Sequence, residues 1–143
     1  MTNSRQYCTF FVNNLFFGVE VEKVQEVIRY QTLTRVPLAP REICGLINLR
    51  GQIVIAIDLR RRLAFDERPA DQLPINVVMR NDDGAVSFLV DDIGDVLEVD
   101  ESVFEPPPPT LSGEQRQLIR GAYKLKDKLL LALDAEKTMD FAV

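Results

Sequence analysis

The chain has 143 residues, 46% of them hydrophobic and 27% charged, and it carries 17 basic and 22 acidic side chains, two cysteines and no histidine. That size fits one domain, or two small lobes that share a core, and buries roughly two thirds of the surface of the unfolded chain. The absence of histidine excludes Ser-His-Asp and Cys-His nucleophiles and imidazole-ligated zinc or haem. The net charge of −5 argues against a protein whose main task is to neutralise phosphates.

Short segments rich in aromatic and β-branched residues predict strands along most of the chain. The first two, residues 7–12 and 15–21, flank Asn13-Asn14, which tolerates positive φ and favours a two-residue hairpin. Hairpin turns are also predicted at residues 82–84 (Asp-Asp-Gly) and 126–128 (Lys-Asp-Lys). The short strands and the turns between them indicate a mostly β barrel or sandwich. The other predicted strands are residues 46–49, 53–57, 75–79, 86–90, 96–99, 122–125 and 129–133.

Helices are expected to be few and short. Val21, Val24 and Ile28 recur at i, i+3 and i+7, which predicts about two helical turns over residues 22–29 with Val24 and Ile28 facing inward. A helix of this length is not stable alone, so it must pack against the strands. Two further short helices are predicted at residues 59–63 and 135–139, each after an N-cap aspartate, Asp58 and Asp134.

Four consecutive prolines, residues 106–109, form the one compositional break in the chain. They cannot join a sheet ladder and predict a polyproline II segment. One interpretation is a stiff surface connection between two β parts, and the other is a ligand for the SH3 or WW domain of a partner. A four-proline run alone favours the first interpretation.

The N-terminal residues are polar and lead straight into a predicted strand, so no signal peptide is expected. No apolar run approaches the ~20 residues that span a bilayer, so no direct membrane insertion is expected. Cys8 and Cys44 lack the spacing of a redox pair or a metal knuckle; a disulfide stays open, and two small buried apolar side chains are the favoured interpretation. These features predict a cytoplasmic protein.

Charge is divided unevenly along the chain. From Arg29 to Arg62 seven arginines face two carboxylates, a balance of +5, and from Asp66 to Glu105 twelve carboxylates face two arginines, a balance of −10. Such halves can attract each other in neighbouring copies or attract separate partners, with ordinary solvated faces as the simpler alternative. The basic stretch also keeps open an alternative function, a small β-barrel nucleic-acid-binding module whose affinity falls steeply with salt.

Residues 45–60 carry the most informative motif, a predicted strand, a tight turn at Arg50-Gly51, an apolar strand and a helix cap. Gly51 supplies the positive φ that a tight turn needs, and Gly45 indicates a bend or a close backbone approach. The apolar run over residues 53–57 has no polar alternation, which predicts that both of its faces are covered. Arg50 is therefore expected at the edge of the most buried region, where it needs a partner.

This motif, with its Gly-Leu-Ile-Asn-Leu-Arg-Gly run, the apolar strand and Asp-Leu-Arg, resembles the CheW family of chemotaxis coupling proteins. Residues 24–28 and 33–37 upstream and residues 89–97 downstream are similar to further segments of that family, in the same order. Two departures are visible: Ile55-Ala56 stands where the family commonly has a proline, and the 106–109 connection is unusually rich in proline.

The resemblance implies a non-catalytic adaptor without a cofactor, in which residues 1–143 form a single domain of two small SH3-like β-barrel lobes packed over a shared hydrophobic core. It implies two partners: the cytoplasmic tip of a methyl-accepting chemoreceptor, which is a helical hairpin bundle, and the regulatory domain of a CheA-type histidine kinase, which has the same fold. A related alternative is a CheW-like module detached from a larger signalling protein.

By the same resemblance, Val24, Ile93 and Val96 match positions that line a receptor-facing groove, with core packing as the alternative. Glu26 and Arg50, beside Gly51, match a charged pair, which we expect at the rim of the groove, holding the short predicted helix against the Arg50-Gly51 turn. An incidental surface pair is the alternative. No catalytic, cofactor-binding or metal-binding residue is expected, since Asp91, Asp92 and Asp95 lack the spacing of a calcium loop.

Overall fold

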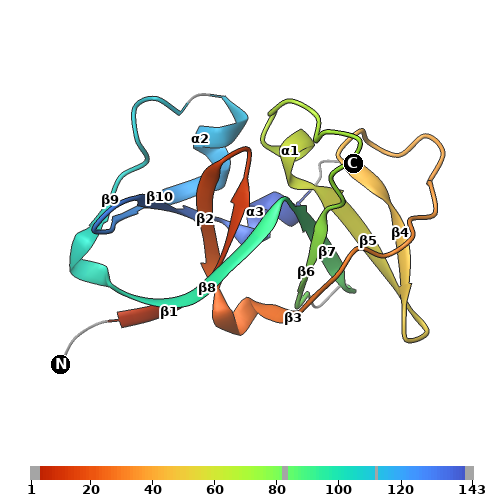
Figure 1. Ribbon diagram of the computed structural model, residues 1–143, viewed down its shortest axis with the longest axis horizontal. Coiled ribbons are helices and arrows are strands. Elements are labelled where there is room, and N and C mark those ends of the chain that lie inside the picture. Colours follow the sequence, from red (N-terminus) through yellow and green to blue (C-terminus); the bar gives the residue numbers. More distant parts are fainter. Residues whose placement is uncertain (1–3, 82–83, 112, 141–143) are drawn as a thin grey trace.

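The computed structural model describes residues 4–81, 84–111 and 113–140, and its strands form two sheets, one in each half of Figure 1. The six-stranded sheet has the order β8-β1-β2-β11-β10-β9, and the five-stranded sheet has the order β3-β6-β7-β5-β4. Neighbours are antiparallel except for β2–β11 and β5–β7. The strands are β1 (Ser4–Val12), β2 (Leu15–Glu20), β3 (Val24–Ile28), β4 (Ile43–Leu49), β5 (Gln52–Asp58), β6 (Ile75–Met79), β7 (Val86–Val90), β8 (Asp92–Asp100), β9 (Phe104–Glu105), β10 (Ile119–Lys124) and β11 (Leu129–Leu133).

Along the described strands the chain passes between the two sheets twice. It leaves the six-stranded sheet after β2 through a single 3-10 turn, Val21–Lys23, and it returns at Asp91, the residue between β7 and β8. The six-stranded lobe is therefore assembled from both ends of the described chain, and the five-stranded lobe from its middle. Both strands that directly follow a passage, β3 and β8, lie at an edge of their sheet.

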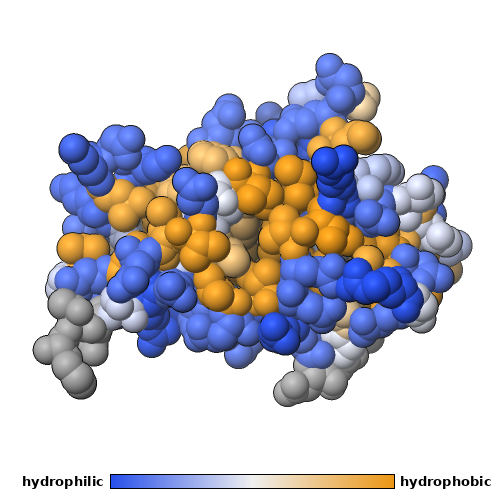
Figure 2. Space-filling view, turned by 60° about the horizontal axis from the view of Figure 1, so that its bottom comes forward, coloured by the Kyte–Doolittle hydropathy of each residue, from blue (hydrophilic) through white to orange (hydrophobic). Residues whose placement is uncertain are grey.

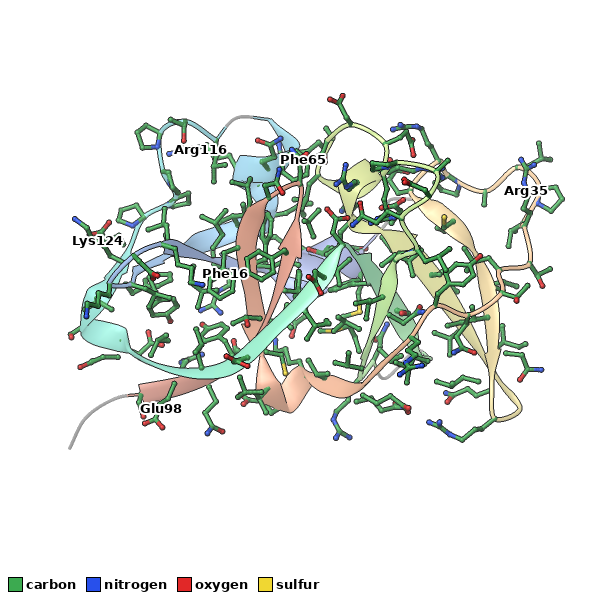
Figure 3. All side chains as sticks on the ribbon, in the orientation of Figure 1. Phe16, Arg35, Phe65, Glu98, Arg116 and Lys124 are labelled. Carbon is green, nitrogen blue, oxygen red and sulfur yellow. The ribbon has the colours of Figure 1, made fainter. Side chains whose placement is uncertain are left out.

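Three apolar clusters fill the molecule, which confirms the predicted architecture of two lobes over a shared core. One cluster, around Tyr7, Phe16 and Tyr123, fills the six-stranded lobe, and Phe16 points into that lobe in Figure 3. A second, around Ile47 and Val54, fills the five-stranded lobe. The third and largest draws on both sheets and lies between them. Its largest fully buried side chains are Phe10, Phe17, Ile57, Leu59, Leu63, Met79 and Phe88.

Local turn and cap signals are confirmed. Asn13 and Asn14 have φ of 52° and 64° between β1 and β2, as a two-residue hairpin requires. Asp58 and Asp134 cap α1 (Leu59–Arg62) and α3 (Ala135–Met139) by accepting hydrogen bonds from backbone N–H groups of the first turn. The predicted turn at residues 126–128 joins β10 to β11. Residues 82 and 83 of the other predicted turn lie outside the described residues.

The predicted helix over residues 22–29 is wrong, because the chain forms strand β3 there after the single 3-10 turn. Antiparallel pairing with β6 satisfies the backbone of this segment, and its β-branched residues suit a half-covered strand. Val24 and Ile28 do face inward, but toward different clusters: Val24 packs on the shared core and Ile28 on the interior of the five-stranded lobe.

The prediction that both faces of residues 53–57 are covered is also wrong. Ile53 is 58% exposed and Ile55 is 39% exposed, whereas Ile57 on the same side of β5 is buried in the shared core. The reason is geometric: the β4–β5 hairpin extends past the opposing sheet, so the shared core covers only its base (Figure 1).

The proline run joins β9 to α2 (Glu114–Leu118), a helix that the sequence did not predict. It is therefore a connection within the six-stranded lobe, and Arg116 donates a hydrogen bond to the Pro108 carbonyl (3.3 Å). Cys8 and Cys44 are both free and half-buried, and burial raises the pKa of each thiol.

Candidate partner-binding surfaces

Glu26 and Arg50 form the expected ion pair, in which Arg50 Nη2 donates to Glu26 Oε2. The hydrogen bond from Arg50, helped by one from Gln25, holds the pKa of the Glu26 carboxyl below its ordinary value. Glu26 lies on strand β3 and not on the predicted helix. The pair therefore links β3, one edge of the five-stranded sheet, to the turn that follows β4, the other edge. It helps to close that sheet into a lobe.

The β4–β5 turn and the start of β4 depend on glycine in two ways. Arg50 and Gly51 both have positive φ, 52° and 85°, and Gly51 N–H donates to Asn48 Oδ1 (3.0 Å). Gly45 provides the predicted close approach: a Cβ atom there would lie 2.7 Å from the Thr34 carbonyl oxygen. That carbonyl accepts from Leu46 N–H (2.8 Å), which fastens the β3–β4 connection to the sheet edge.

Val24, Ile93 and Val96 come from the edge strands β3 and β8. Val24 and Ile93 are half-buried and pack on the shared core. Val96 is 58% exposed and sits opposite Cys8, which also packs on that core. A register shift in β3 sets Val27, also exposed, opposite the core residue Val77.

We call Val24, Val27, Ile93 and Val96 the apolar band. The lower side of Figure 1, along which β8 and β3 run, comes forward in Figure 2, where apolar residues gather along the middle of the face. The band therefore contains residues that pack on the shared core as well as residues that are exposed. It extends the shared core to the surface along two edge strands, one from each lobe.

A second apolar surface was missed by the sequence interpretation. Ile53 and Ile55 project from the same side of β5, and Leu46, half-buried on β4, is paired with Ile55. We call these three residues the isoleucine face. A hairpin that exposes consecutive same-side isoleucines is typical of a protein–protein contact. The sequence shows the isoleucines but not the length of the opposing sheet, which decides whether they are covered.

Much of the positive charge of the basic stretch is paired within the molecule. Arginines of the basic stretch form ion pairs with carboxylates from elsewhere in the chain, which reduces the charge that a nucleic-acid-binding module would use. These pairs are Arg41–Glu67, Arg50–Glu26, Arg60–Asp91, Arg61–Glu67 and Arg62–Glu114.

Two negative findings apply to residues 4–81, 84–111 and 113–140. Among them, no three Cys, Asp or Glu side chains gather closely enough to hold a metal ion. No helix in this part of the chain is both long and apolar enough to cross a membrane.

The fold is that of a two-lobed β protein in which some exposed apolar side chains gather on two edge strands and on a projecting hairpin, as in proteins that bind other proteins. Residues 6–142 match the model of the CheW-like domain. The chain belongs to the CheW-like family, whose members are scaffolding proteins of chemotaxis.

Individual relatives agree with this assignment. The chemotaxis protein CheW of Bacillus subtilis is 33% identical over 92% of this chain and 84% of its own length. The crystal structure of the scaffolding protein TtCheW from Thermoanaerobacter tengcongensis superposes with a TM-score of 0.85 at 26% identity, covering 99% of this chain and 94% of that one. The chemotaxis protein CheV3 of Helicobacter pylori is 28% identical, and the match covers 87% of this chain but 41% of CheV3.

Proposed function

We propose that this protein is a non-catalytic adaptor that couples methyl-accepting chemoreceptors to a CheA-type histidine kinase in chemotaxis signalling. The observation that carries the proposal is the apolar band, in which one edge strand from each lobe presents partly exposed side chains continuous with the shared core. Membership of the CheW-like family supports the same function. Coupling by binding requires neither a nucleophile nor a cofactor.

The receptor tip is the proposed occupant of the apolar band. A helical hairpin presents an apolar stripe of residues at i, i+3, i+4 and i+7, which suits a strip built from two strands. Val24 and Ile93 provide the floor of the site and Val96 its exposed wall, while Glu26, in the middle of β3, pairs with Arg50 of the β4–β5 turn.

The isoleucine face is the proposed site for the regulatory domain of the kinase. Ile53 and Ile55 lie on β5, whereas the apolar band lies on β8 and β3, and β6 and β7 separate β3 from β5 in the five-stranded sheet. Because different strands carry the two sites, both partners can bind at once, as a coupling protein requires. The protein then acts in the cytoplasm, associated with membrane receptor arrays through its partners and not with nucleic acid.

The test is a binding experiment with a receptor signalling fragment and a kinase regulatory domain. Val96→Asp is expected to weaken binding of the receptor fragment by about tenfold or more and to spare the kinase domain, because a buried carboxylate opposes the apolar contact. Ile53→Asp is expected to do the reverse. Leu73→Asp, at a residue with 62% exposure outside both surfaces, is the matched control.

The proposal would be contradicted if Val96→Asp and Ile53→Asp both bound the two partners as well as the wild type does. It would also be contradicted if Leu73→Asp lost as much binding as these two variants. If the wild-type chain bound neither partner, the coupling function itself would be wrong. Binding of duplex DNA that weakens steeply with salt would favour the nucleic-acid alternative.

A further inference from the structure

Strand β8 pairs with β1 in the six-stranded sheet, and one residue, Asp91, joins it to the five-stranded sheet. Asp91 is the whole covalent connection between β7 and β8, and β8 carries Ile93 and Val96 of the apolar band. Val24 and Val27, the other half of the band, belong to β3 in the opposite sheet. The spacing of the band is therefore set by how the two sheets are held together at their passages.

Asp91 is tied to both lobes by its backbone and its side chain. Its N–H donates to the Phe11 carbonyl (2.9 Å), and its Oδ2 accepts from Asn13 N–H (2.8 Å), so it is fixed to the β1–β2 hairpin of the six-stranded lobe. From the other lobe, Arg60 donates through Nε to both carboxylate oxygens (3.0 Å each) and through Nη2 to Oδ2 (2.6 Å).

Arg68 completes this network. Its Nε donates to Asp91 Oδ1 (2.9 Å), and its Nη atoms lie 3.4 and 3.5 Å from the Asp58 carboxylate at the end of β5. We call Asp58, Arg60, Arg68 and Asp91 the Asp91 cluster. Its two cations and two anions balance, and the side chains are only 5–11% exposed.

A balanced, nearly dry cluster adds little net stability compared with apolar packing, but it strongly favours one geometry, because any displaced member leaves a buried charge unpaired. Because an arginine that contacts both carboxylate oxygens must lie in a fixed orientation, these contacts restrict the orientation of the two side chains as well as the distance between them. None of the hydrogen bonds and ion pairs described for Asp91 involves a residue of the apolar band. Any effect of Asp91 on the band is therefore transmitted through β8.

We propose that Asp91, held by Arg60 and Arg68, is a positioning residue that fixes the spacing between β3 and β8 and thereby the affinity of the apolar band for a helical partner that it does not touch. This inference rests on the proposed function for the identity of the partner. If the inference is correct, receptor binding depends on how the two lobes are placed relative to each other as well as on the side chains of the band.

The geometric part is tested without any partner. Nitroxide labels are attached to cysteines placed at two exposed positions, Glu98 on β8, which is labelled in Figure 3, and Gln25 on β3. The native Cys8 and Cys44 are replaced by serine. The distance distribution between the labels is measured by pulsed electron paramagnetic resonance.

In the labelled protein, Asp91→Asn is expected to shift or broaden this distribution. The control is Asp71→Asn, which makes the same chemical change at an exposed position in the connection before β6. If Asp91→Asn does not fold, as judged by circular dichroism, Arg68→Lys serves in its place, because it keeps the charge but loses the fork that joins Asp91 to Asp58.

The binding part uses the same variants without labels. Asp91→Asn is expected to weaken binding of the receptor fragment roughly tenfold. A loss of this size is within the range seen when the substituted residue does not contact the ligand. Binding of the kinase domain is expected to stay within about twofold, because the isoleucine face lies on a single hairpin of one sheet. Equal loss of both partners is the signature of a merely structural role.

An unchanged label distance in Asp91→Asn overturns the inference, and so does a changed distance with unchanged receptor binding. Equal weakening of both partners also overturns it. If the distance changes but the wild-type chain itself binds no receptor fragment, the proposed function fails while the role of Asp91 in lobe spacing is supported.

Discussion

At the scale of single residues, Arg50 combines a left-handed backbone with an outward-reaching side chain. A non-glycine residue at φ of 52° is uncommon, and here it occupies the first position of the β4–β5 turn, followed by Gly51 at 85°. That geometry directs the guanidinium away from its own hairpin and toward Glu26 on β3. The turn could be predicted from Gly51, whereas the direction of the Arg50 side chain depends on the closure of the lobe.

Arg50→Ala removes the ion pair at little cost in stability, because the Arg50 side chain is 64% exposed. We expect a nearly unchanged thermal midpoint and weaker retention of the receptor fragment or the kinase domain in a pull-down. Glu26→Gln should reproduce the loss, and the double variant should bind no worse than either single one. Unchanged retention of both partners would show that the pair is incidental.

Asp91 gives the chain a defined response to acid. Burial raises the pKa of its carboxyl, but hydrogen bonds from Arg60, Asn13 N–H and Arg68 prevail, so the folded-state pKa lies below the ordinary value of 3.8. A carboxyl with a lowered folded-state pKa contributes stability that is complete above its unfolded-state pKa and is lost as pH falls through the folded-state value.

We therefore expect wild type to exceed Asp91→Asn in free energy of unfolding at pH 7 by about 1–3 kcal/mol, since a charged hydrogen-bond network is broken. The difference should persist down to about pH 4 and shrink at lower pH. Urea unfolding of the two proteins at pH 7 and pH 3 measures this. A difference that grows on acidification would contradict the assigned direction.

At the scale of elements, local signals predicted more than long-range ones. The Asn13-Asn14 hairpin and the caps at Asp58 and Asp134 depend on nearby backbone groups, and all are present. The apolar spacing of residues 21–28 predicts a helix, but pairing with β6 makes residues 24–28 strand β3. The exposure of Ile53 depends on where the opposing sheet ends, which no local pattern contains.

The features of the candidate site also differ in whether the sequence could predict them. The Glu26–Arg50 pair and the Gly45 close approach were accessible from the motif and its family resemblance. The Asp91 cluster was not, because Asp58, at the end of β5, becomes a neighbour of Asp91, just after β7, only when those two strands pair in parallel. The sequence around Asp91 shows only that its carboxylates lack the spacing of a calcium loop.

Gly45 provides a test of how the β3–β4 connection is fastened. In Gly45→Ala the new Cβ meets the Thr34 carbonyl oxygen, a backbone atom that cannot move without breaking its hydrogen bond to Leu46. We expect a loss of about 1–3 kcal/mol in the free energy of unfolding from overpacking. Gly51→Ala has open space around the new Cβ and should lose only about 1 kcal/mol from its positive φ. A milder effect at position 45 than at position 51 would contradict the close approach.

At the scale of the whole molecule, the shared core is the largest of the three clusters and belongs to neither lobe alone. The six-stranded lobe also takes its strands from two separate parts of the chain. Each lobe has only a smaller cluster of its own and shares the largest one with the other lobe, so the two are expected to unfold together.

Phe88→Ala tests this cooperativity, since Phe88 lies on β7 in the five-stranded sheet and is fully buried in the shared core. We expect a loss of about 3–5 kcal/mol in the free energy of unfolding. The near-ultraviolet signal of Tyr7 and Tyr123, in the other lobe, should disappear at the same urea concentration as the far-ultraviolet signal. Two separate transitions would show that the lobes are independent.

The two passages of the chain between the sheets also set an order of events during synthesis. As the protein leaves the ribosome, every strand of the five-stranded lobe is available once β7 has emerged. The β1–β2 hairpin must wait until β8 to β11 follow, because Tyr7 and Phe16 pack in a cluster whose other members, such as Tyr123 and Leu130, lie on those later strands. The protein emerges as a finished lobe flanked by an unfinished one, and it is during this interval that a chaperone would have most to bind.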